Sequence, residues 1–264
     1  MVLPLTSRDL IKRSLTVEIS AILTFLALWE AVARFKLLPA YALPSIEEVA
    51  AALYSQAVLG NLSYALPHSL LHLALGFAAA FAVAFPLGMA MGWYRVAQRF
   101  FEPLIGIFRP IPPIAWIPFA LLFFVSLLQA SAFIIFIGAF FPLVTNIFFG
   151  FRNVPKQLAE IAHSFGASER EILLKVAFPS ALPSILTGVK VGLGVAWMCV
   201  VAAEMFGAPG LGFMIMQMRY VHDIAGVVAY MAVIGALGLL LEVLVKLLER
   251  KLLKWRIGLV AEGI

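Results

Sequence analysis

Long apolar runs separated by short polar segments dominate the chain. Six runs reach the length of a membrane span: about 15–34, 65–93, 103–125, 130–150, 180–206 and 224–247. A helix needs about 20 mainly apolar residues to cross the hydrocarbon core of a bilayer. Strand-like alternation is weak, and stretches such as 77–85 have no polar face, which disfavours a membrane β-barrel. We therefore predict an all-α integral membrane protein with six transmembrane helices.

The composition indicates that the protein is surrounded by lipid. Hydrophobic residues make up 63% of the chain and charged residues 12%, and the mean hydropathy is +1.03. Soluble domains are roughly half apolar and about a quarter charged. The single cysteine, Cys199, excludes an intrachain disulfide and a cysteine-cluster metal site. The apolar run that follows residues 1–14 lacks a small-residue cleavage pattern, so we expect a retained first helix.

The distribution of basic residues predicts the orientation of the spans. With the N-terminus inside, fourteen Lys and Arg residues fall in cytoplasmic segments and three in outer segments. Because cytoplasmic loops are enriched in Lys and Arg, we expect both termini in the cytoplasm and the protein in the cell (inner) membrane. The net charge of +5 gathers in short loops between apolar runs, which argues against a nucleic-acid partner.

Three regions follow from this topology. We expect a cytoplasmic segment at 1–14, a six-helix transmembrane domain at 15–250 and a cytoplasmic tail at 251–264. Within the domain, 153–179 is the longest polar stretch and lies between the fourth and fifth spans. Small residues support close packing of the spans, because Gly88–Gly92 and Gly188–Gly192 have the G-x-x-x-G spacing.

The shorter polar segments carry local signals. Ser45 and Glu48 have the spacing of a capping box, which predicts a short amphipathic helix outside the membrane. Residues 94–102 look like a brief basic turn, and 207–223 like a turn-rich loop. Prolines at 110, 112 and 113 are predicted to break the third span, because proline removes a backbone donor and interrupts a helix.

The stretch at 153–179 predicts a helix, a glycine turn and a second helix. Asn153 is a suitable N-cap for the first helix, with Pro155 in its first turn. Gly166 suits the left-handed position that ends a helix. Ser168–Glu171 is a second capping box, opening a helix that runs to Pro179. An apolar stripe recurs at helical spacing on the first helix, formed by Leu158, Ile161, Ala162 and Phe165.

This stretch resembles the cytoplasmic motif of ABC importer permease subunits, E-A-A, three residues, G, nine residues, I-x-L-P. The chain has Glu160, Ile161 and Ala162, then Gly166, then Val176-Ala177-Phe178-Pro179. Every spacing matches, and the three departures are apolar exchanges. The resemblance implies a helix-turn-helix coupling segment that docks on an ATPase subunit. The implied contact residues are Glu160, Ile161, Ala162, His163, Ser164, Phe165, Gly166 and Ala167.

Further segments look like the branch that handles nitrate, aliphatic sulfonates, taurine or bicarbonate. They are 43–45, 109–113, 188–190, 202–204 and 247–250. The resemblance implies the permease of an ATP-driven importer, with a second permease copy, two ABC ATPase subunits and an extracytoplasmic solute-binding protein as partners. The sequence holds no P-loop pattern, so we expect ATP hydrolysis by a separate subunit and no cofactor in this chain.

Charged and aromatic residues inside spans are candidates for the translocation path. Arg109 is expected either to face the path and favour an anion or to extend to the cytoplasmic headgroups. Lys190 is expected to attract an anion, pair with a carboxylate or extend inward. Glu204 is expected to be a gate, to contact the solute-binding protein or to be an interfacial carboxylate. Trp116 and Trp197 line the path or pack in the core.

His68 and His72 have a spacing compatible with a metal, but no third ligand is evident, so no metal site is predicted.

An enzyme and an ion-coupled secondary transporter are the two functions that we compare with the importer. No catalytic constellation stands out, which argues against an enzyme. An ion-coupled secondary transporter is the alternative, although such proteins tend to show internal repeats and midplane carboxylates.

Overall fold

The computed structural model of the chain describes residues 7–35 and 43–253. Within these residues the chain consists of helices and the segments that connect them. The predicted all-α fold is confirmed. The elements are α1 (Ser7–Arg34), α2 (Ile46–Val58), α3 (Asn61–Trp93), α4 (Arg95–Phe108), η1 (Pro113–Trp116), α5 (Ile117–Phe123), α6 (Leu127–Arg152), α7 (Lys156–Ser164), α8 (Glu169–Ile172), η2 (Leu173–Ala177), α9 (Phe178–Glu204), α10 (Leu211–Tyr220) and α11 (Ile224–Leu252). Residues 1–6 and 254–264, which hold parts of the predicted terminal segments, lie outside the described residues.

Four helices in the described part are long and apolar enough to cross a membrane. They are α3, α6, the continuous stretch Glu169–Glu204 and α11. The pair formed by α4 and η1–α5 makes a fifth if it counts as one span. The expected first span at 15–34 falls within α1, which is not among these helices, so the sixth span stays a prediction.

The third expected span is not one continuous helix over 103–125. It divides into α4 and η1–α5, which meet at an angle of 84°. The break lies at Arg109–Pro112, so the predicted interruption by prolines is confirmed. The expected basic turn at 94–102 is wrong, because α4 already begins at Arg95. Only Tyr94, with an extended backbone, separates α4 from α3.

Glycines let α3, α6 and α9 approach closely. A Cβ added at Gly76, Gly88 or Gly92 of α3 would lie 2.5–2.8 Å from a side-chain atom of α6. Gly188 and Gly192 of α9 face α6 in the same way, at 2.8 and 3.0 Å. Both G-x-x-x-G pairs therefore serve helix packing within the chain, which confirms their predicted packing role.

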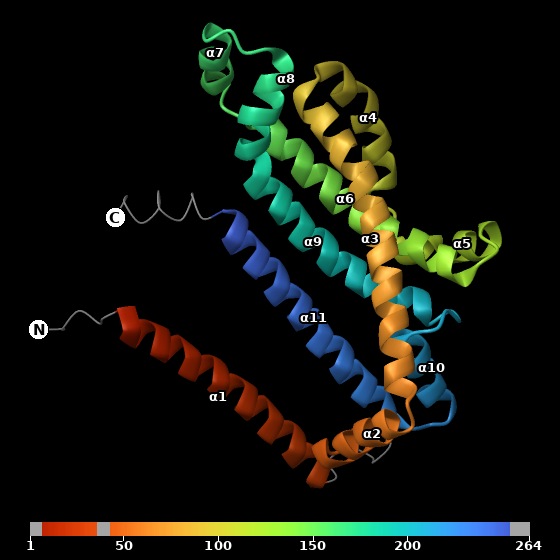
Figure 1. The fold of residues 1–264 in the computed structure, drawn as a ribbon. Coiled ribbons are helices and arrows are strands. Elements are labelled where there is room, and N and C mark those ends of the chain that lie inside the picture. Colours follow the sequence, from red (N-terminus) through yellow and green to blue (C-terminus); the bar gives the residue numbers. More distant parts are fainter. Residues whose placement is uncertain (1–6, 36–42, 254–264) are drawn as a thin grey trace, which may run out of the picture.

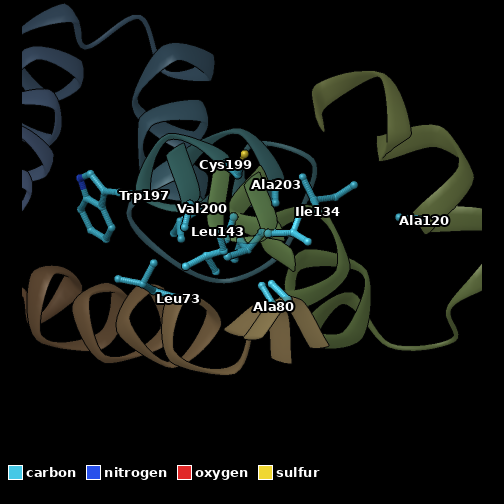
Figure 2. Packing of buried hydrophobic residues seen from close by; sticks show 14 of the residues in the cluster. Leu73, Ala80, Ala120, Ile134, Leu143, Trp197, Cys199, Val200 and Ala203 are labelled. Carbon is cyan, nitrogen blue, oxygen red and sulfur yellow. The ribbon is translucent and has the colours of Figure 1, made fainter. Parts of the chain in front are cut away.

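The core lies where these three helices meet. Leu73 and Ala80 come from α3, Ile134 and Leu143 from α6, and Val200 from α9, and Figure 2 shows their side chains gathered at one place. All five are at most 5% exposed. Figure 1 shows α3, α6 and α9 side by side, α11 next to α9, and α1 standing apart from the bundle.

The short helices lie at opposite ends of this bundle. The predicted capping box of α2 is confirmed, because Ser45 Oγ accepts from the Glu48 N–H at 3.2 Å and Glu48 Oε2 accepts from the Ser45 N–H at 2.8 Å. The end of α1 is tied to this region, since the Trp29 indole N–H donates to the Pro44 carbonyl at 2.9 Å. Figure 1 shows α2 and α10 at the end opposite α7 and α8.

The expected loop at 207–223 is only partly a loop. It holds the ten-residue helix α10 between two turns. Gly207 has a φ of +111°, and Gly212 lies so close to α9 that an added Cβ would be 2.4 Å from the Val201 carbonyl oxygen. The glycines that suggested a loop are therefore the residues that let a helix fold back against α9.

We expect Gly76→Ala to destabilise the protein and Gly235→Ala to leave it unchanged. The added methyl at Gly76 would lie 2.5 Å from the Ile135 Cβ, whereas at Gly235 of α11 it meets nothing within 4 Å. Overpacking of this kind costs about 1–3 kcal/mol. The free energy of unfolding of the purified protein, measured in a detergent titration, checks this. Equal values for the two variants would show that α3 and α6 are not in close contact.

Candidate functional site

The first part of the candidate site is the projection formed by α7 and α8. Asn153 does not cap α7, as the sequence suggested. Its N–H donates to the Phe149 carbonyl at 3.1 Å, so it ends α6 instead, because α6 runs on to Arg152. Pro155 takes the N-cap position of α7. The projection lies at one end of the bundle (Figure 1).

The turn between α7 and α8 has the predicted glycine geometry. Gly166 has a φ of +81°. Its N–H donates to the His163 carbonyl at 2.9 Å, and the Ala167 N–H donates to the Ala162 carbonyl at 3.0 Å. These two bonds form a Schellman motif, which satisfies the last carbonyls of α7.

The second capping box is also confirmed. Ser168 Oγ accepts from the Glu171 N–H at 3.4 Å, and Glu171 Oε2 accepts from the Ser168 N–H at 3.1 Å. The helix that it opens does not stop at Pro179. It passes through the π-helical turn η2 into α9, which gives one helical stretch from Glu169 to Glu204. The π-turn ends just before Pro179, which has no N–H to donate, and the Phe178 N–H donates to the Leu173 carbonyl.

Charged contacts hold the projection together. The Lys175 ammonium donates to Glu171 at 2.9 Å, and His163 Nε2 lies 3.2 Å from Glu169 Oε1, which links α7 to α8. The bond from Lys175 and those from Ser168 lower the pKa of Glu171 from 4.5 to about 2. Because this pKa is lowered, ionised Glu171 stabilises the folded projection. This contribution to stability is complete above about pH 4.5 and is lost as the pH falls toward 2.

The apolar stripe of α7 is uncovered in this chain. Leu158 is 43% exposed, Ile161 54% and Phe165 88%. Ala162, between them, is half-buried. Large apolar side chains grouped on one face of a projecting helix are typical of a surface that binds a partner.

The second part of the candidate site is a cavity half-way along the spans. It has a volume of about 290 Å³ and lies between α6, α9 and the break that follows α4. Its lining includes Arg109 from the break, Thr145 and Asn146 from α6, and Val191 and Val195 from α9. These positions are near the middle of α6 and α9, so the cavity lies half-way along these helices.

Trp116 lies against a separate, wholly apolar cavity of about 310 Å³. Its ring neighbours include Phe108, Phe119 and Phe133, with centroid distances of 5.8–6.3 Å. The indole N–H is buried and finds no acceptor among the described residues. The structure thus places Trp116 in an aromatic cluster and not beside Arg109.

Lys190 and Trp197 lie together near α11. The Lys190 ammonium is 3.8 Å from Glu242, so pairing with a carboxylate is the arrangement present. The indole N–H of Trp197 donates to the Ile234 carbonyl at 3.1 Å, and its ring packs against Gly238. Both residues line a cavity of about 190 Å³ between α9 and α11.

Glu204 is fully buried within the chain. It is 0% exposed, and polar groups from α3 and α10 surround its carboxylate. Ser69 Oγ donates to it at 2.8 Å, the Gly212 N–H donates at 2.9 Å, and His72 Nδ1 lies 2.9 Å away. The carboxylate is covered because α10 folds back over it, and a Cβ at Gly210 would overlap it.

Comparison with known proteins identifies the family. The family described as binding-protein-dependent transport system inner membrane component matches residues 84–254. This range covers well over half of the chain. The chain belongs to this family. Its members are membrane permeases of ABC transporters. The prediction of a permease is therefore confirmed, and the alternative of an ion-coupled secondary transporter is not supported.

Curated relatives of this permease are also permease proteins. The chain is 46% identical over 171 residues to the putative ABC transporter permease protein MJ0413 of Methanocaldococcus jannaschii, covering 64% of each chain. It is 32% identical over 251 residues to the taurine transport system permease protein TauC of Escherichia coli, covering 93% of this chain and 91% of TauC. The bicarbonate transport system permease protein CmpB of Synechococcus elongatus is 38% identical over 172 residues, covering 63% of this chain and 61% of CmpB.

A solved structure shares the fold of the permease. A chain of the MetNI methionine ABC transporter, in inward-facing conformations, superposes with a TM-score of 0.64 at 22% identity. The match covers 75% of this permease and 98% of that chain. At this identity the likeness concerns the fold alone.

Sequence reasoning missed several polar residues that the fold brings to these sites. Thr145 and Asn146 were hidden in an apolar run and are significant only because Arg109 lies across the same cavity. Ser69 and His72 lie 135 and 132 residues from Glu204. Their spacing of three residues on one helix face was the available signal, and it indicated a shared neighbour but not which one.

We expect Glu204→Ala to destabilise the permease strongly. The change would leave Ser69, His72 and the Gly212 N–H without their partner, at about 1–3 kcal/mol for each buried group left unpaired. Glu204→Gln keeps one acceptor oxygen and should lose less. Thermal unfolding of the purified protein measures this.

Glu242→Ala is the matched control, because that carboxylate is 44% exposed and pairs with Lys190 and Lys246, which are themselves 42% and 52% exposed. If both Ala variants melted at the temperature of the unchanged protein, the buried network would contribute nothing to stability.

Proposed function

We propose that two copies of this permease form the alternating-access path of an ATP-driven importer, with two ATPase subunits inside and a solute-binding protein outside. The observation that carries the proposal is the uncovered apolar stripe of α7 in a chain of the binding-protein-dependent transport family. The stripe belongs to a rigid projection that is capped at its turn and at the start of α8. Such a projection suits a groove on an ATPase subunit.

The proposed path for mechanical coupling is the helical stretch Glu169–Glu204. It starts in the projection and, as α9, supplies Val191 and Val195 to the mid-span cavity. A displacement of the projection would therefore move a wall of the cavity. A continuous helix transmits such a shift, whereas a loose loop would absorb it. The π-turn at Leu173–Ala177 is the place where this lever can bend.

The proposed solute is a small anion such as an aliphatic sulfonate, taurine, nitrate or bicarbonate. The names of TauC and CmpB give taurine and bicarbonate as what those systems transport. Both compounds carry a negatively charged oxygen group. The mid-span cavity suits such a group, because Arg109 is the charged residue in its lining. We propose that a second copy of the chain supplies the rest of the path.

The proposed topology has six spans, with α1 as the first and both termini in the cytoplasm. Apolar side chains of α1 support this, since Ile22, Leu23 and Phe25 are each 60% exposed and Leu28 is 64% exposed. Lipid or the second copy would cover them. The excess of basic residues on the side of α7 and α8 supports a cytoplasmic position for the projection.

We expect Ile161→Asp to abolish binding of the ATPase subunit and energised uptake. A carboxylate in the middle of the apolar stripe would be desolvated on docking, which is unfavourable without a partner. Lys156→Asp is the control, because it places a carboxylate on the opposite face of the same helix. Co-purification of the ATPase with each variant measures the effect. Retained binding in Ile161→Asp, or equal loss in both variants, would remove the stripe from the interface.

We expect cysteine labelling to place α7 inside the cell and α2 outside. In a Cys199→Ala background, Tyr54→Cys on α2 should react with a membrane-impermeant maleimide in intact cells. Ser164→Cys on α7 should react only after the membrane is permeabilised. Both positions are exposed in the chain. The cells should express the permease without the ATPase subunit, because the proposed docking would cover Ser164, so that the membrane alone decides accessibility to the reagent. Labelling of Ser164→Cys in intact cells would reverse the topology and contradict the proposed docking.

A further inference from the structure

Two cavities meet at the same pair of residues. The mid-span cavity of about 290 Å³ and a second cavity of about 240 Å³ beside α4 are both lined by Arg109 and Thr145. Arg109 is the C-cap of α4, and Thr145 belongs to α6. A residue pair shared by adjoining cavities lies at the passage between them.

The hydroxyl of Thr145 is not used by its own helix. Four other helical hydroxyls in the described residues donate to the carbonyl four residues earlier, at 2.7–3.0 Å: those of Thr24, Ser164, Ser180 and Thr187. Thr145 makes no such bond, and no hydrogen bond to another described residue. Its neighbour Asn146 differs, because the amide donates to the Pro142 carbonyl at 2.8 Å. Thr145 thus keeps a free donor at the cavity.

Arg109 also lacks an acidic partner. Within the described part of the chain, the salt bridges join other residues, and the guanidinium of Arg109 takes part in none. The remaining lining of the mid-span cavity is mostly apolar. Arg109 itself is exposed in the isolated chain, and a cation beside an apolar cavity wall attracts an anion more strongly than it would in open water.

The charges decide which cavity an anion would occupy. The cavity beside α4 also holds Glu102, which would repel an anion. The mid-span cavity has Arg109 and, beside it, the polar side chains of Thr145 and Asn146. The favourable position is therefore on the mid-span side of the pair.

We propose that Arg109 and Thr145 form a binding seat for the oxyanion group of the transported solute. The guanidinium would pair with two oxygens of a sulfonate, nitrate or bicarbonate, and the Thr145 hydroxyl would donate to another oxygen. This inference rests on the proposed function and adds to it the residues and the chemical group that they recognise. The planar fork of arginine matches such a group better than the point charge of lysine.

The test is energised uptake by the complete complex in proteoliposomes, at saturating loaded binding protein. The probes are labelled taurine, nitrate and bicarbonate. We expect uptake of the transported probe to fall at least tenfold in Arg109→Gln and about tenfold in Thr145→Val, because each loses donors to a charged group. Arg109→Lys should fall in between. Thr145→Ser should restore uptake, since it keeps the hydroxyl.

Two controls separate binding from folding. Thr187→Val removes a hydroxyl that is already bonded to the Pro183 carbonyl at 3.0 Å, and uptake should stay unchanged. Co-purification of the ATPase subunits with each variant measures whether the complex still assembles. Loss of both uptake and assembly in Thr145→Val and Thr145→Ser would assign Thr145 a structural role and overturn the seat.

The outcomes also distinguish the two levels of the proposal. If the unchanged complex imports none of the probes on addition of ATP, the proposed solute class fails, and the seat fails with it. If the unchanged complex imports a probe but Arg109→Gln and Thr145→Val import it equally well, the seat is wrong while the importer function stands.

Discussion

Close contact between α3, α6 and α9 is the constraint on which the rest of the structure depends. Lipid provides no hydrophobic force between helices, so association requires van der Waals contact at short range. Gly76, Gly88 and Gly92 on one side of α6 and Gly188 and Gly192 on the other supply it, since none has room for a Cβ without a shift. The two glycine faces hold α6 between α3 and α9. Because α6 is held in this way, Thr145 is positioned opposite the break at Arg109.

The stretch Glu169–Glu204 connects every part of the candidate site. It begins at the capping box of the projection, passes the mid-span cavity and ends at the buried carboxylate of Glu204. Through Glu204 it also holds the start of α10, because the Gly212 N–H donates to that carboxylate. Both ends of one helix are thus fixed to short elements on opposite sides of the bundle. A rotation of this helix would alter the projection, the cavity wall and the position of α10 together.

Features that depend on a few neighbouring residues were predictable from the sequence. The Ser45 and Ser168 capping boxes, the left-handed Gly166 and the proline break of the third span are all local and are all present. Features that depend on distant partners were not. A glycine-rich stretch indicates a turn, yet α10 forms because Ser69 and Glu204 bind its first N–H groups. The meeting of Arg109 with Thr145 likewise requires the packing of α6, which no local pattern specifies.

The two basic residues inside the spans show how a charge at this depth is accommodated. A charged side chain in the centre of a span costs about 2.5–3.5 kcal/mol on insertion, so it requires compensation. Lys190 has it from Glu242, 3.8 Å away, and both groups are partly exposed. Arg109 has no carboxylate partner among the described residues, and its neighbours across the mid-span cavity are neutral. A permanent anionic partner at Arg109 would neutralise the charge that a passing anion needs. The unpaired cation is therefore consistent with a site whose counter-ion is the solute itself, bound for part of each cycle and then released.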